Sequence, residues 1–265
     1  MKAKKHHSTG AVLARITIIA ALLLIGVIAL IYFSGIRYIR VDTEAGYIKF
    51  LGRVDRSGAP VSGTLVYENG VRADIDVEKS EIVYSNGDLY DGPLKDLRRS
   101  GEGRLIYMNG DVYEGSFRED QIDGYGTYSY VNGDVYEGDF RLGMIDGTGT
   151  YTWNDGSRYT GGFSDGRREG QGVHEYANGD RYEGSYHNDQ KEGQGTYTWN
   201  SGDRYEGEYH NDARSGSGKF TWANGESYEG EFRNNQLFGW GSYTWPSGRV
   251  YNGYFENGAI VRVKE

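Results

Sequence analysis

The sequence predicts an all-β repeat rod: an elongated, twisted single antiparallel sheet of tandem 23-residue β-hairpins, preceded by one N-terminal transmembrane α-helix. Three observations predict this fold class. Tyrosines recur every 23 residues, aromatic and polar residues alternate around them, and glycine-containing turns separate the alternating stretches. With 42 glycines, 24 tyrosines and only 3 prolines, the composition favours strands joined by tight turns.

The composition also excludes several kinds of site and partner. No cysteine is present, which excludes disulfides, thiol catalysis, iron–sulfur clusters and thiolate zinc sites. Residues 1–33 carry four basic side chains and no acidic one, so the remainder holds 25 basic and 38 acidic side chains, a net charge of −13. That charge would repel nucleic acid, which we exclude as a partner, and it disfavours an anionic lipid surface.

The first elements are a basic tail, residues 1–15, and a transmembrane helix, residues 16–33. The helix segment has no charged side chain, and its length of about 27 Å as a helix approaches the roughly 30 Å hydrocarbon core of a bilayer. Arg15 would reach one interface and Tyr32 the other. Two alternatives stay open. A cleaved signal peptide would usually show a small-residue cleavage site, and a buried globular helix would need aliphatic surface elsewhere.

The charge around this helix predicts a single-pass orientation. Basic residues before the helix favour a cytoplasmic N-terminus and place the repeat domain outside the cytoplasm. Arg37 and Arg40 follow the helix, so the difference between the two ends is small. Residues 34–62 form a juxtamembrane connector for which the sequence predicts no particular structure. Residues 63–83 are interpreted as a degenerate repeat or cap, because Tyr67 precedes an Asn-Gly pair.

Eight tandem repeats are expected over residues 84–258, followed by a C-terminal tail, residues 259–265, that could add a capping strand. Each repeat has a tyrosine, a glycine two residues later and, two residues beyond that, an aromatic side chain, replaced once by Leu94. A further aromatic residue lies six positions before each repeat tyrosine. The repeat tyrosines are Tyr90, Tyr113, Tyr136, Tyr159, Tyr182, Tyr205, Tyr228 and Tyr251.

Residues 124–140 illustrate the expected hairpin. Alternation on both sides of Asn132-Gly133 predicts two strands with one aromatic and one polar face. Asn-Gly is the strongest short hairpin signal because both residues tolerate positive φ. Gly138 is expected to leave room for a ring from the paired strand, and the pair Gly124 and Gly126 is expected to mark the turn into the unit.

The pattern GxGxYxxxNGDxYEGxF, repeated every 23 residues from 84 to 255, closely resembles the membrane occupation and recognition nexus (MORN) repeat. The resemblance implies a scaffold, linker or membrane-associated adaptor. Some members of this family also carry lipid kinase or methyltransferase domains, but no stretch longer than about 30 residues remains here for one. We therefore expect a non-catalytic protein without a cofactor.

The aromatic face is the candidate functional site. We expect it to form a long groove that binds a protein partner, because a single sheet has no second layer to cover it. Alternative occupants are a cell-envelope glycan, bound by stacking or cation–π contacts, and lipid head groups. Self-packing of the rings on one another is the competing interpretation. The expected groove residues are Tyr113, Tyr136, Trp153, Tyr159, Tyr182, Trp199, Tyr205, Trp222, Tyr228 and Trp245.

Two other recurring side chains could suggest metal sites, and we expect neither to be one. The acids Asp88, Asp111, Asp134, Asp180 and Asp203 follow the turn glycines, and copies one repeat apart should lie about 10 Å from each other. That separation is too large for a shared calcium ion, so hydrogen bonds within the turns are expected instead. The same distance separates His187 from His210 and excludes a shared zinc ion.

Overall fold

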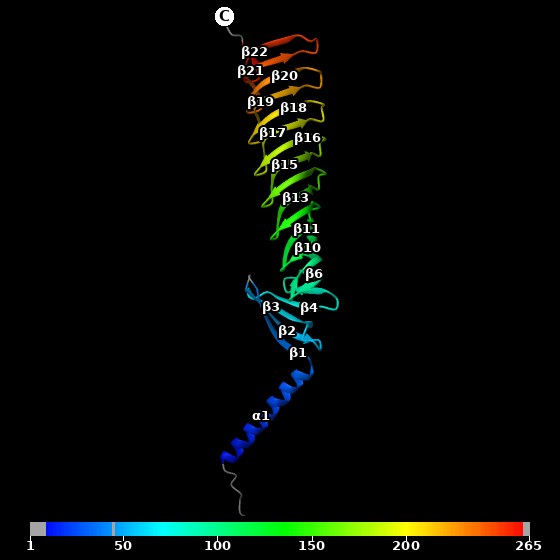
Figure 1. Cartoon of the computed structure of the whole chain (residues 1–265), viewed down its shortest axis with the longest axis vertical. Helices are drawn as coiled ribbons and strands as arrows, with labels where there is room; N and C mark the ends of the chain where they lie inside the picture. The colour runs from blue at the N-terminus through cyan, green and yellow to red at the C-terminus, as the bar shows by residue number, and fades with distance from the viewer. Residues whose placement is uncertain (1–8, 44–45, 262–265) are drawn as a thin grey trace, which may run out of the picture. The chain divides into compact units, whose positions relative to one another are not determined.

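The computed structural model describes residues 9–43 and 46–261, and Figure 1 shows the course of the chain. Contacts divide it into two compact units, residues 1–99 and 100–265, which are described separately. Most of the basic tail and the last four residues of the C-terminal tail lie outside the described residues. The predicted interfacial role of Arg15 also lies outside the described side chains.

The first unit begins with helix α1, Thr9–Phe33. The stretch Ile16–Phe33 is long and apolar enough to cross a membrane, with a mean hydropathy of 2.9. None of this stretch is buried by the protein, and Leu30, for example, is 74% exposed. The predicted helix is therefore present, and its apolar surface lies uncovered.

Beyond the helix, the first unit is a β-meander. Strands β1 to β6 each pair with the next in antiparallel register, and β7 and β8 form a separate two-residue hairpin. Its core is mainly aliphatic, with Ile48, Leu65 and Ile82 fully or almost fully buried. The strands are β1 Ile36–Thr43, β2 Gly46–Val54, β3 Pro60–Tyr67, β4 Arg72–Asp76, β5 Glu81–Tyr84, β6 Leu89–Asp91, β7 Leu94–Lys95 and β8 Arg98–Arg99.

The connector between the helix and the repeats already follows the repeat pattern. Gly52 of β2 pairs with Gly63 of β3. A Cβ atom added to either glycine would lie within 2.8 Å of the Phe50 ring. Phe50 and Gly52 thus stand in the places of the repeat tyrosine and its glycine. The hairpin architecture therefore begins before residue 63, in a segment for which no particular structure was predicted.

The second unit is one open antiparallel sheet, which confirms the predicted fold class. Figure 1 shows its strands following one another in chain order along the unit, each paired with its sequence neighbours. Within residues 100–261, strands and turns are the only elements. The strands are β9 Gly101–Ile106, β10 Val112–Arg118, β11 Gln121–Ser129, β12 Val135–Arg141, β13 Met144–Thr152, β14 Arg158–Ser164, β15 Arg167–Glu175, β16 Arg181–His187, β17 Gln190–Thr198, β18 Arg204–His210, β19 Ala213–Thr221, β20 Ser227–Arg233, β21 Gln236–Thr244, β22 Val250–Glu256 and β23 Ala259–Ile260.

Two kinds of turn alternate along this sheet. At Asn132-Gly133 only the glycine has a positive φ, of 93°, and the Gly133 amide donates to the Tyr130 carbonyl over 2.9 Å. This is a three-residue loop with a left-handed glycine. The second connection is a two-residue turn at Leu142-Gly143, where both residues have positive φ. The hairpin predicted at Asn132-Gly133 is therefore present, and its three-residue loop needs a positive φ only at the glycine.

Gly124 and Gly126 both lie inside strand β11, so the prediction that they mark a turn was wrong. Gly126 pairs with Gly115 on one side and Gly138 on the other. Gly124 lies beside a register shift and has a φ of 112°, which an L side chain rarely adopts. These glycines permit a β-bulge and a close ring contact inside the sheet.

Candidate functional site

The repeat tyrosine is the centre of each hairpin. The ring of Tyr136 lies over the glycine pair Gly138 and Gly149, where an added Cβ would lie 2.5 and 2.4 Å from the tyrosine oxygen. Tyr136 precedes Gly138 on the same strand, so the ring over Gly138 comes from that strand and not, as predicted, from the paired one. Of these two glycines, only Gly149 makes room for a ring from the neighbouring strand, because it lies on β13 and Tyr136 lies on β12. The Tyr136 hydroxyl donates to the Asp139 carbonyl over 3.0 Å.

That hydrogen bond closes the β-bulge of the repeat. Between β12 and β13 the register shifts from Gly138–Gly149 to Phe140–Ile145, so Asp139 has no direct partner on β13. The Tyr136 hydroxyl satisfies the Asp139 carbonyl at this irregularity. The same bond recurs from the repeat tyrosines at 113, 159, 182, 205 and 228.

The repeat tyrosines and the aromatic residues four positions after them form a continuous aromatic row, which we call the inner row. Tyr136 packs edge-on against Phe140 and Phe163, with ring centroids 5.1 and 5.3 Å apart. Because the edge of one ring meets the face of the next, these contacts add to the gain from burial. Burial raises the pKa of Tyr159 to about 12, as it does for Tyr228. The inner row thus links every repeat to the next.

A second aromatic row, the outer row, runs beside the three-residue loops and is half-buried, apart from the buried His174 and Phe220. Tyr128 and Tyr130 have ring centroids 4.5 Å apart, and Tyr130 lies 5.9 Å from Tyr151 of the next repeat. The contacts continue without a break to the last repeat. The row comprises Tyr107, Tyr128, Tyr130, Tyr151, Trp153, His174, Tyr176, Tyr197, Trp199, Phe220, Trp222, Tyr243 and Trp245.

The ten predicted groove residues divide between the two rows. The six tyrosines at 113, 136, 159, 182, 205 and 228 belong to the inner row and have no exposed surface. Their expected place on an open groove surface is therefore wrong in this structure, because the glycine pairs draw their rings into the sheet. The tryptophans Trp153, Trp199, Trp222 and Trp245 lie in the outer row and are half-buried. A role of these tryptophans in binding stays a prediction.

The two rows enclose a hollow on the aromatic face. Near Ile145 it has a volume of about 390 Å³ and is lined by Tyr130 and Tyr151 of the outer row and by Phe140 and Phe163 of the inner row. The size and aromatic lining suit an apolar side chain of a ligand.

One position on the aromatic face lies between the two rows, and we call the surface there the floor. This position changes from an apolar to a charged side chain along the sheet. It holds Ile122 and Ile145 in the first repeats, then the cations Arg168, Lys191 and Arg214. Each cation lies over aromatic rings, Lys191 within 5.6 Å of the ring centroids of three tyrosines. Sequence reasoning missed this set, although its spacing of 23 residues was available as a signal.

The outer row holds one histidine, His174, at a position that is tyrosine or phenylalanine at 128, 151, 197, 220 and 243. His174 is 7% exposed and stacks on Trp153 and Tyr176. Burial, followed by the charges of Arg168 and Lys191, lowers the pKa of His174 to about 4. The histidine is therefore neutral at pH 7, and its Nδ1 lies 3.2 Å from the Arg168 guanidinium.

The turn carboxylates have the role predicted for them and also link repeats. The Asp134 carboxylate accepts a hydrogen bond from Asn132 in its own turn, and in the following repeat from the Asn154 amide and the Tyr151 hydroxyl. Hydrogen bonds within the turns are confirmed for all five carboxylates. Among residues 9–43 and 46–261, no group of three or more His, Asp or Glu side chains is placed to hold a metal ion.

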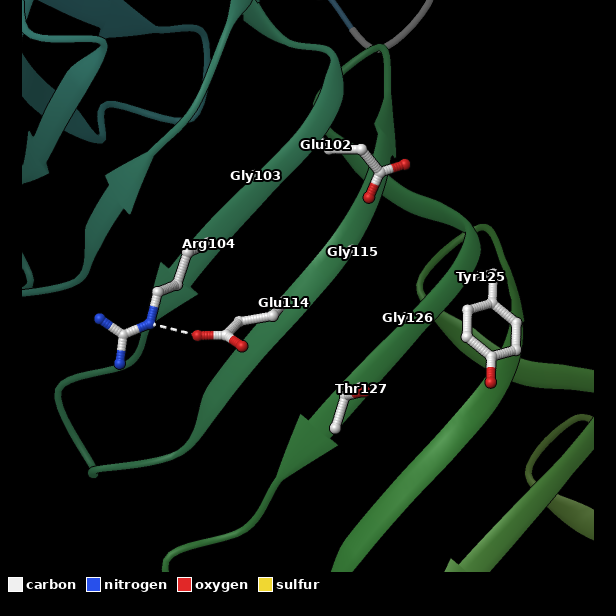
Figure 2. A pocket seen from close by; sticks show the side chains of 8 residues that line it. All are labelled: Glu102, Gly103, Arg104, Glu114, Gly115, Tyr125, Gly126 and Thr127. Carbon is white, nitrogen blue, oxygen red and sulfur yellow. Dashed lines mark ion pairs between the residues drawn. The ribbon is translucent and has the colours of Figure 1, made fainter.

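The opposite face of the sheet is polar. Figure 2 shows a shallow hollow there, in which Arg104 of β9 and Glu114 of β10 face each other as an ion pair of 2.7 Å. Tyr125 is 57% exposed, and its hydroxyl donates to Glu137 over 2.9 Å. Further along this face, His187 and His210 are exposed and each contacts a glutamate over 3.0 Å. Cross-strand charge pairs of this kind suit a solvated surface.

Two solved structures are distant likenesses of this chain. The TCP10 domain of Danio rerio CPAP, in complex with a peptide of Danio rerio STIL, is 14% identical, covers 83% of this chain and 100% of that one, and has a TM-score of 0.39. The TCP domain of Drosophila melanogaster SAS-4, in complex with a proline-rich motif of Ana2, is 14% identical, covers 78% and 99%, and has a TM-score of 0.34. Scores this low indicate neither a shared function nor a shared partner.

No curated protein matches the sequence. The model of the MORN repeat, in contrast, matches six consecutive segments, residues 113–135, 136–158, 159–181, 182–204, 205–227 and 228–248. The eight-repeat count over residues 84–258 stays a prediction outside those six. Because the matched segments cover half of the chain and coincide with the hairpins that carry both aromatic rows, the chain belongs to the MORN repeat family.

Proposed function

We propose that this chain is a non-catalytic, membrane-tethered scaffold that binds a protein partner along the outer aromatic row. The observation that carries the proposal is the unbroken, mostly half-buried row from Tyr107 to Trp245 beside a hollow lined by aromatic rings. Half-buried tyrosines and tryptophans offer large rigid contact areas with little loss of side-chain entropy on binding.

Helix α1 supplies the tether in this proposal. Its apolar side chains are uncovered, and transferring them into hydrocarbon is favourable. The N-terminus stays in the cytoplasm and the repeats lie outside it. A protease added to intact cells then removes the repeat unit of full-length protein, whereas the opposite orientation protects it.

A protein suits the aromatic face better than an envelope glycan does. Sugar stacking needs a flat ring face open to solvent, but Trp153 already stacks on His174 at 5.0 Å with 16° between the rings. Trp199 and Trp222 are both held by rings at 4.5 to 5.5 Å. The hollow near Ile145 stays open beside these rings, and its size suits a side chain of a peptide.

Capture from the native membrane tests this function with a matched pair of variants. Trp222→Ala removes an outer-row ring, whereas Trp240→Ala removes a ring that is 64% exposed and alternates onto the polar face. The proposal predicts one set of captured proteins for the wild type and Trp240→Ala, reduced with Trp222→Ala. Equal capture by all three contradicts it. Binding of purified envelope glycan that Trp222→Ala abolishes, with no captured protein, assigns the face to the alternative.

A further inference from the structure

The cations in the floor of the aromatic face differ in whether an opposite charge already neutralises them. Arg168 forms an ion pair of 3.0 Å with Asp189 and also donates to the Asp189 carbonyl. At the equivalent place beside Arg214 the chain has Asn235, whose side-chain oxygen carries no charge. The Arg214 guanidinium therefore has hydrogen-bond partners but no carboxylate.

Lys191 is the least satisfied of the three cations. Its Nζ lies 4.9 to 5.6 Å from the ring centroids of Tyr176, Tyr182 and Tyr197. The ammonium of Lys191 makes no hydrogen bond or ion pair with any residue that the structure describes. Asp212 accepts a hydrogen bond from the Lys191 backbone amide and, with Asp180, faces the ammonium only at longer range.

Burial is the first cause that lowers the pKa of both Lys191 and Arg214. Both cations have thus lost hydration without gaining a bound anion. An anion placed in the floor would recover that loss, since hydrogen bonds to charged groups are the stronger kind.

The spacing of these cations selects a backbone conformation for the ligand. Lys191 on β17 and Arg214 on β19 are separated by one intervening strand, so they lie about 10 Å apart at 4.8 Å per strand. A polyproline II helix has three residues per turn and rises 3.1 Å per residue, so every third side chain recurs on one face after about 9 Å. In a β-strand every third side chain would point to the opposite face.

We propose, resting on the proposed function, that the partner docks an acidic polyproline II segment on the aromatic face, with carboxylates at every third residue over Lys191 and Arg214. The outer-row tyrosines and tryptophans flank this segment and contact its proline rings. The net charge of −13 outside residues 1–33 repels other acidic surfaces, so the attraction is confined to this floor. A flat lipid surface fits less well, because the ammonium of Lys191 is recessed among three rings.

The test uses full-length protein in nanodiscs of phosphatidylcholine and fluorescein-labelled (Pro-Pro-Glu)5, with binding followed by anisotropy. The proposal predicts binding that weakens with salt, and at least about tenfold weaker binding of (Pro-Pro-Gln)5 and (Pro-Pro-Pro-Glu)5. The second peptide keeps the charge but loses the three-residue period. Absence of (Pro-Pro-Glu)5 binding, or equal binding of all three peptides, overturns the proposal.

The matched variants keep residues that this fold already carries. Lys191→Ile with Arg214→Ile installs the residue found at 122 and 145, so folding is preserved, and is expected to weaken (Pro-Pro-Glu)5 binding at least about tenfold. Lys219→Thr removes one cation from the polar face, where threonine occupies the equivalent position at 196, and is expected to leave binding unchanged. Equal effects of both changes overturn the proposal.

Two further outcomes separate this inference from the proposed function. If the double variant still captures the partner while Trp222→Ala does not, the scaffold function stands and the acidic-segment inference falls. If vesicles containing phosphatidylserine bind the full-length protein, lose binding with the double variant, and (Pro-Pro-Glu)5 does not bind, the floor belongs to a lipid head group instead.

Discussion

Replacing Tyr205 with phenylalanine should destabilise the repeat unit far more than the same change at Tyr209. Both tyrosines are buried, at 0% and 5% exposure, and their rings lie 5.3 Å apart in the same repeat. Both changes keep the ring and its edge-on contacts. They differ in one hydrogen bond, because the Tyr205 hydroxyl donates to the Glu208 carbonyl over 2.9 Å. The Tyr209 hydroxyl has no hydrogen-bond partner among the described residues.

The magnitude follows from that difference. Glu208 lies at the bulge where the ladder shifts between Gly207 and Tyr209, so its carbonyl relies on the tyrosine hydroxyl. Leaving a buried acceptor unsatisfied costs about 1–3 kcal/mol, which is the expected loss for Tyr205→Phe. Tyr209→Phe should stay within about 0.5 kcal/mol of the wild type, since phenylalanine already occupies the equivalent position at 140, 163 and 232.

Urea unfolding followed by tryptophan fluorescence measures both changes. A lower midpoint with an unchanged slope is expected for Tyr205→Phe, because the surface exposed on unfolding stays the same. Tyr209→Phe serves as the control for loss of a hydroxyl without loss of a bond. Equal midpoints for the two variants, or a larger shift for Tyr209→Phe, would refute the bulge-closing role of the repeat tyrosine.

Three further predictions concern other residues of the repeats. His174→Tyr should remove an acid-dependent loss of stability. The pKa of His174 is lowered from 6.5 to about 4, so its contribution to folding stability is present above pH 6.5 and is lost as the pH falls toward 4. Urea unfolding midpoints across that pH range measure this loss. Gly149→Ala should cost about 1–3 kcal/mol in urea unfolding, because the new Cβ would lie 2.4 Å from the Tyr136 oxygen. Asp180→Ala should cost about 1–2 kcal/mol and speed hydrogen exchange of the Asn200 amide, which donates to Asp180 over 2.8 Å.

Each of these predictions has its own control. Tyrosine stands at 128, 151 and 197 in the place of His174, so a destabilised His174→Tyr protein with an unchanged pH dependence would contradict the titration argument. Gly156 has a positive φ but open space around it, so Gly156→Ala reports backbone strain alone and should cost less than Gly149→Ala. Ser157 accepts one inter-repeat hydrogen bond, from Ala177, and Ser157→Ala should be milder than Asp180→Ala. Equal effects within either pair would contradict the packing argument.

Much of the fold could be predicted because its rules are local. The 23-residue period and the alternation around Asn132-Gly133 determine two strands and a loop without reference to distant residues. The two-residue turn at Leu142-Gly143 carried no such signal, since leucine rarely adopts a positive φ and does so here because two residues must close the hairpin. Residues 34–62 escaped prediction because Phe50 replaces the tyrosine that defines the pattern.

The candidate site could be predicted only in part. Alternation places Tyr136 and Trp153 on the same face, but it does not say which ring sinks over a glycine pair. That depends on the bulge at Asp139, a register shift that no short motif encodes. The floor cations Lys191 and Arg214 were within reach, because they depart from isoleucine at a fixed place in the repeat. A prediction based on the aromatic residues alone does not include them.

Site-specific photocrosslinking in the native membrane tests the partner-binding surface most directly. The photoreactive residue p-benzoylphenylalanine would replace Trp222 on the aromatic face or Trp240 on the polar face of full-length protein. The outer row predicts a discrete crosslinked protein from position 222 and none from position 240. A protein crosslinked from position 240 alone, or no protein crosslinked from position 222, would contradict the assignment of the partner to the aromatic face.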